Sequence, residues 1–141
     1  MSFWKISPWL SRLVILAVAA LFSLISFKFI VDPHTAAAAS GISVEPGIGY
    51  TNTRAGFGGF PLGFALILVF CLFSSRWLLA ALASIATVAM VILAVRIFGA
   101  AQDHTFTESA HLLAPEAVIA GIALLAAAME RTRHAREAGA G

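Results

Sequence analysis

Six polar residues stand near the ends of otherwise apolar stretches, where their side chains could form a binding site or a set of ion pairs. They are Asp32, Asn52, Arg54, Arg96, Asp103 and Glu116. An ionisable side chain inside an apolar segment is energetically costly, so an acid and an arginine at the same depth tend to pair. We therefore expect Glu116 to be the central residue, with Arg54 and Arg96 as its counter-ions or as anion-binding groups.

The spacing of the charges along the sequence places these residues at a similar depth in a bilayer. Three pairs of charges are separated by 20 to 22 residues, roughly 30 Å along a helix: Arg12 and Asp32, Arg54 and Arg76, and Arg76 and Arg96. That length matches the thickness of the hydrocarbon core of a bilayer. Glu116 precedes Glu130 by 14 residues, about 21 Å, and so lies below the same surface. Two interpretations remain open: ion pairs that hold helix ends together, or an outward-opening polar pocket with Glu116 at its floor.

A metal or haem site has weaker support in the sequence. His104, Glu108 and His111 follow the spacing i, i+4, i+7, which on one helix face would present a ligand set suited to zinc or iron. However, Thr105 and Glu108 form a capping box, which starts the helix at Thr105 and leaves His104 outside it. Haem would need a second axial histidine at similar depth, for which His34 is the candidate. We therefore predict no metal site, assign no catalytic residue and leave any cofactor unknown.

The composition predicts the elements that must carry these residues. Hydrophobic residues make up 60% of the 141 residues and charged residues only 11%, and the mean hydropathy is +0.94. These values exclude an ordinary soluble domain and a disordered chain. Four runs are long and apolar enough to span a bilayer as helices: 10–31, 55–73, 77–99 and 111–129. The sequence thus predicts an all-α integral membrane four-helix bundle in residues 1–130, followed by a basic cytoplasmic tail at 131–141.

The distribution of lysine and arginine predicts the orientation. With four spans, six of these residues fall on the side of the termini and three on the other side, so both termini are expected in the cytoplasm. The first run is expected to be retained, because Lys28, Asp32 and Pro33 separate its apolar core from the alanines that resemble a signal-peptide cleavage site. The basic residues are scattered rather than clustered on one face, which excludes nucleic acid as the expected partner.

Small residues indicate close approach between helices. The stretch from Asn52 to Gly63 contains four glycines, and Gly59 and Gly63 form a G-x-x-x-G pair that Ala117 and Gly121 match in the fourth run. Such pairs allow helix backbones to approach closely within a membrane. We expect tight helix packing at these positions.

Three features, in this order, resemble a family of small bacterial membrane proteins known only as a domain of unknown function. They are the stretch from Asn52 to Gly59, the arginine followed by a short acidic loop from Arg96 to Asp103, and the early glutamate Glu116. The resemblance covers roughly residues 27–127, and the overall plan is more loosely similar to DoxX-like proteins. It implies a four-helix bundle in the bacterial inner membrane, and it implies no reaction.

These observations predict a small multi-pass protein of the bacterial inner membrane that is an accessory or ligand-binding subunit rather than an enzyme. The alternative is a membrane enzyme or redox subunit that acts on a lipid-soluble or small anionic substrate at the same polar site. The expected partners are the lipid bilayer and either a larger membrane complex or further copies of the chain. A transporter is disfavoured because the midplane of all four runs is apolar and Glu116 lies near one surface.

Overall fold

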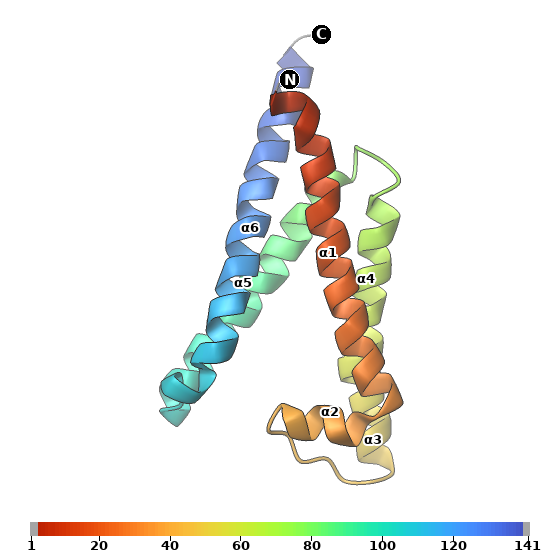
Figure 1. Ribbon diagram of the computed structural model, residues 1–141, viewed down its shortest axis with the longest axis vertical. Helices are drawn as coiled ribbons and strands as arrows, with labels where there is room; N and C mark the ends of the chain where they lie inside the picture. The colour runs from red at the N-terminus through yellow and green to blue at the C-terminus, as the bar shows by residue number, and fades with distance from the viewer. Residues whose placement is uncertain (1–2, 140–141) are drawn as a thin grey trace. The chain divides into compact units, whose positions relative to one another are not determined.

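The computed structural model describes the backbone of residues 3–139 and the side chains of residues 8–136. Within this part of the chain every regular element is a helix (Figure 1). The elements are α1 (Phe3–Val31), α2 (Pro33–Ala39), α3 (Ile48–Thr53), the π-helix η1 (Arg54–Gly59), α4 (Phe60–Cys71), α5 (Leu78–Asp103) and α6 (Phe106–Gly139). The predicted all-α class is confirmed.

Four stretches of the described residues are long and apolar enough to cross a membrane. They are Pro8–Val31, Ile48–Cys71, Leu78–Asp103 and Phe106–Arg136. The second combines α3, η1 and α4 into one uninterrupted helical stretch. Only 17 to 33% of the most apolar window of each stretch is buried inside the protein, so most of each helix surface is left for lipid or a partner.

The helices extend beyond the apolar runs from which they were predicted. The second begins at Ile48 instead of residue 55, the third continues to Asp103 instead of 99, and the fourth starts at Phe106 instead of 111 and runs on to Gly139. Polar side chains alone do not end a helix, and α5 ends instead at His104, which adopts the left-handed conformation. Only His104 and Thr105 therefore separate α5 from α6, and residues 131–139 of the expected tail are helical.

The chain divides into two compact units. The α1–α4 unit contains residues 16–73, and the α5–α6 unit contains residues 1–15 together with 74–141. Helix α1 contributes to both units. Each unit is described separately below.

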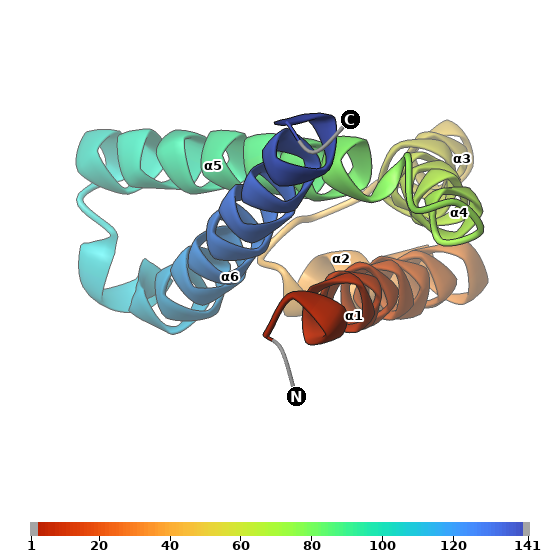
Figure 2. The same ribbon diagram turned by 90° about the horizontal axis from the view of Figure 1, so that it is seen from above.

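The α5–α6 unit is a helical hairpin closed by a two-residue turn (Figure 2). His104 adopts the left-handed conformation at φ 56° and ends α5, and α6 begins directly after Thr105, as the capping box predicted. Small or compact side chains are buried along the two helices: Leu78, Ala81, Leu82, Ile85, Ala86, Ala120, Ala123 and Ala126. Small side chains allow helices to pack closely in a membrane, where dispersion contacts rather than water exclusion stabilise the contact.

The α1–α4 unit is held together by aromatic contacts and by one close backbone approach. Phe22 packs edge-on against Phe64 with ring centroids 5.4 Å apart, and Phe29 stacks on Phe57 at 5.3 Å. A Cβ atom on Gly58 would lie only 2.6 Å from Cγ1 of Ile30. Gly58 is therefore the residue that allows η1 to approach α1.

The G-x-x-x-G glycines do not lie at such a contact. A Cβ atom on Gly63 or Gly121 would meet no atom within 4 Å, and one on Gly59 would meet only the Arg54 carbonyl oxygen of its own helix, at 3.8 Å. Among the described residues, the tight packing that we expected at these glycines is not formed. The contact lies one residue before the motif, at Gly58.

The π-helix η1 follows from the local sequence. Pro61 has no N–H to offer the carbonyl of Phe57, and its ring crowds the preceding turn. Three glycines in η1 also lower its α-helical propensity. The backbone therefore forms a wider turn, in which the N–H of Phe60 donates to the carbonyl of Ala55. Such wide turns are frequent at functional sites.

Gly58→Ala should destabilise the α1–α4 unit by about 1–3 kcal/mol, because the added methyl group forces Ile30 or η1 to move. Gly56→Ala is the matched control, since a Cβ atom at Gly56 meets nothing within 4 Å. It should be neutral or slightly stabilising, since alanine favours the helix. The free energy of unfolding in detergent measures both variants. Equal effects would show that Gly58 is not at a close contact.

Candidate functional site

Arg96 of α5 and Glu116 of α6 form a bidentate ion pair. Nε of Arg96 donates to Oε2 of Glu116 and Nη2 donates to Oε1, each at 2.6 Å. The two side chains are 32% and 21% exposed, so both are largely removed from solvent. Two parallel charge-assisted bonds fix the relative orientation of the planar groups. The pair joins the two helices of the hairpin and neutralises both charges.

Arg54 makes a different contact, in the other unit. Its Nε donates to the backbone carbonyl of Ile30 at 3.0 Å. The last carbonyls of a helix have no intrahelical donor, and Ile30 lies in the last turn of α1, which the Asp32–Pro33 step ends. Arg54 therefore caps the C-terminal end of α1 and joins it to η1.

Asp32 begins α2. Its carboxylate accepts a hydrogen bond from the backbone N–H of Thr35 at 3.1 Å, the usual arrangement of an N-cap, and Pro33 occupies the first helical position. Hydrogen bonds from the side chain and backbone of Thr35 lower the pKa of Asp32. Asp32 is thus ionised at neutral pH and fixes the start of α2.

The six predicted residues divide between the two units. Asp32, Asn52 and Arg54 belong to the α1–α4 unit, and Arg96, Asp103 and Glu116 belong to the α5–α6 unit. Within the described side chains, Arg96 and Glu116 are the members of the set that contact each other. Asn52 and Asp103 are exposed on their helices. The six residues therefore comprise one ion pair, two capping interactions and two exposed side chains.

The histidine and glutamate set considered for a metal does not form a cluster. His104 lies in the turn, whereas Glu108 and His111 are exposed on α6. Across the described residues, no group of three or more histidine, cysteine, aspartate or glutamate side chains is arranged to hold a metal ion.

Sequence reasoning missed a second buried carboxylate, Glu130 on α6. Its side chain is fully buried, and Oε2 accepts a hydrogen bond from Oγ of Ser11 at 3.2 Å. Both Nε and Nη2 of Arg133 donate to Oε1, and Nε2 of His134 lies 3.7 Å from the same oxygen. The i, i+3, i+4 spacing of the α6 residues was readable, but the partner on α1 was not. This cluster joins the start of α1 to α6.

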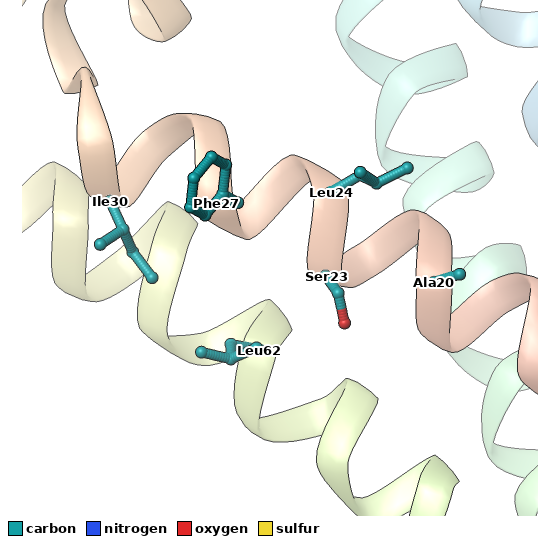
Figure 3. A pocket seen from close by; sticks show the side chains of 6 residues that line it. All are labelled: Ala20, Ser23, Leu24, Phe27, Ile30 and Leu62. Carbon is teal, nitrogen blue, oxygen red and sulfur yellow. The ribbon is translucent and has the colours of Figure 1, made fainter.

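An apolar groove lies between α1 and α4 (Figure 3). It has a volume of about 530 Å³ and is lined by Ala20, Ser23, Leu24, Phe27, Ile30 and Leu62. A second groove of about 420 Å³ shares Phe27 and continues past Lys28 and Asp32 to Thr35 and α2. The surface of both grooves is almost entirely apolar, although Lys28 and Asp32 are among the residues around the second. Ile30 in the wall is also the residue whose carbonyl Arg54 caps.

No protein-family model, curated protein or solved structure matches the chain.

Glu116→Gln should lower the free energy of unfolding by about 2 kcal/mol, because it leaves Arg96 without a counter-ion in a largely buried position. Glu108→Gln is the control, since Glu108 is exposed on the same helix. The charge-swapped variant Arg96→Glu/Glu116→Arg should recover part of the loss. A denaturant titration in detergent measures all three, and equal stabilities of the two glutamine variants would contradict the ion pair.

Asp32 should titrate below the usual value of about 3.9 for an aspartate. Because the pKa of Asp32 is lowered in the folded protein, the ionised carboxylate stabilises α2 fully above about pH 4. This stabilisation is lost as the pH falls through the lowered pKa. Carboxyl carbon NMR shifts give the titration, and amide exchange at Thr35 reports the cap. Asp32→Asn retains the acceptor oxygen and should abolish the acid sensitivity of this cap. If Asp32 titrates at or above about 4, the N-cap interaction is absent.

Proposed function

We propose that the chain is a multi-pass protein of the bacterial inner membrane, a four-helix bundle with both termini in the cytoplasm. Four helices of sufficient length and apolarity support the membrane location. The excess of lysine and arginine on the side of the termini supports the orientation. The resemblance of residues 27–127 to small bacterial four-helix membrane proteins supports the bacterial membrane.

We propose further that the protein is a non-catalytic accessory or ligand-binding subunit. The observation that carries the ligand-binding role is the pair of grooves on α1. Their shared residue, Phe27, connects an apolar section of about 530 Å³ to a section that contains Lys28 and Asp32. A lipid-like molecule with a long apolar part matches this apolar lining. In the proposed orientation the second groove lies toward the outward-facing end of α1.

The Arg96–Glu116 pair has a supporting role in this proposal. Each charge is already matched by two hydrogen bonds, so the pair offers little net charge to a ligand. It stabilises the hairpin that carries the third and fourth helices. Arg54 acts in the same way on the groove, because it fixes the carbonyl of Ile30 in the groove wall.

The alternative is an enzyme or redox subunit that acts on a lipid-soluble substrate at the same groove. The size and apolar lining of the groove suit a lipid-soluble substrate as well as they suit a ligand that is bound and released unchanged. The two functions differ in what happens to the bound molecule. An accessory subunit releases it unchanged, whereas an enzyme converts it in the presence of the appropriate co-substrate.

Purification in a mild detergent followed by native mass spectrometry tests the ligand-binding role. We expect an amphiphilic molecule to be released from the wild-type protein and to be reduced at least about tenfold in Ala20→Trp, because the indole would fill the groove. Ala17→Trp is the control, since Ala17 is exposed on α1 outside the groove lining. Equal retention by both variants would contradict binding in this groove. A second chain present at a fixed ratio would support the accessory role, and conversion of the released molecule would contradict it.

A further inference from the structure

In the α5–α6 unit, an arginine of α1 binds the residue that directly precedes a second arginine. Nη2 of Arg12 on α1 donates to Oγ of Ser75 at 3.1 Å. Arg76, the next residue, is exposed just before α5 begins at Leu78. The guanidinium of Arg12 also lies 5.7 Å from the centre of the Trp9 ring. We call Trp9, Arg12, Ser75, Arg76 and Trp77 the Arg12–Arg76 patch.

None of the carboxylates whose side chains the structure describes pairs with this positive charge. Elsewhere in the same unit Arg96 is paired with Glu116, and Arg133 is paired with Glu130. Among the side chains described, no carboxylate lies within ion-pair distance of Arg12 or Arg76. Glu130 is linked to the neighbouring Ser11, but Arg133 and Ser11 already bind its two oxygens.

The start of α5 adds further positive potential. The N-terminal end of a helix carries a partial positive charge, which a basic side chain does not offset. No side-chain hydrogen bond caps this end at Trp77, and Arg76 directly precedes it. Two guanidinium groups and the helix end therefore form a region that favours an anion.

The residues around the patch indicate which class of anion it binds. Trp9 and Trp77 are 72% and 57% exposed, and exposed tryptophans in membrane proteins occupy the headgroup level. Arg12 lies near the beginning of the first candidate span and Arg76 just before the third, so both are at the end of an apolar helix. Guanidinium groups bind phosphate through parallel hydrogen bonds, and a serine hydroxyl adds a further donor.

We propose that the Arg12–Arg76 patch binds the phosphodiester headgroup of an anionic phospholipid. The two guanidinium groups and the Ser75 hydroxyl hold the phosphate oxygens, and the indoles of Trp9 and Trp77 lie at the level of the glycerol. The site belongs to the α5–α6 unit, so it is separate from the grooves on α1 and does not depend on the ligand proposed for them.

Native mass spectrometry of the full-length protein in detergent, titrated with phosphatidylglycerol or phosphatidylcholine, tests the proposal. Wild-type protein should bind one phosphatidylglycerol in clear preference to phosphatidylcholine. Arg12→Gln/Arg76→Gln should weaken that affinity about thirtyfold, since each arginine near an anionic lipid contributes roughly fivefold. Arg131→Gln/Arg136→Gln removes the same charge from α6 and should change the affinity less than about threefold.

Three further measurements make the test decisive. Arg12→Lys/Arg76→Lys should retain part of the affinity, because the charge remains. Exposed Arg76 can be replaced alone by glutamine, with an expected loss of about fivefold, if the double variant does not fold. Inorganic phosphate at the lipid concentration should not displace the lipid. The proposal is wrong if both glutamine double variants lose affinity equally, if phosphatidylcholine binds as well, or if inorganic phosphate competes.

Discussion

A carboxylate in an apolar helix is kept ionised only where cations and hydrogen-bond donors reach its oxygens, and α6 meets this condition twice. Glu116 receives both of its bonds from Arg96 on α5, and Glu130 receives its bonds from Arg133 on α6 and Ser11 on α1. An unmatched charge at either place would be expensive in hydrocarbon. These two networks therefore determine which helices must lie against α6, at two levels separated by 14 residues.

The rest of the packing follows from the absence of a strong hydrophobic force between helices inside a membrane. In the α5–α6 hairpin small buried alanines allow close contact between the charged residues. In the α1–α4 unit the contact depends on Gly58 and on ring stacking between Phe29 and Phe57. Arg54 joins the end of α1 to η1 with a hydrogen bond to a carbonyl that the helix itself leaves without a donor. Hydrogen bonds and ion pairs of polar side chains, together with close packing at small residues, thus stabilise the contacts between helices.

The helical class and the number of apolar helices were predictable, because hydropathy over about 20 residues is a strong signal. The helix ends were not, because polar residues such as Asn52 and Asp103 continue a helix when no proline or left-handed residue stops it. Charges at matching depth made Arg96 and Glu116 plausible neighbours. The same reasoning gave no sign that Arg54 caps a carbonyl or that Ser11 binds Glu130, since both contacts depend on how helices distant in sequence pack. The glycine in contact is Gly58 and not the Gly59 of the motif, and adjacent residues of a helix lie on different faces.

The central claim is that Arg96 and Glu116 are both ionised and directly bonded. Solid-state NMR of the protein in lipid bilayers, with nitrogen label in arginine and carbon label in glutamate, measures this through the dipolar coupling between the two side chains. We expect a guanidinium nitrogen within about 4 Å of the Glu116 carboxyl carbon, together with the chemical shift of a carboxylate. The coupling should be lost in Glu116→Gln. A protonated Glu116 with no arginine nitrogen in range would contradict the account.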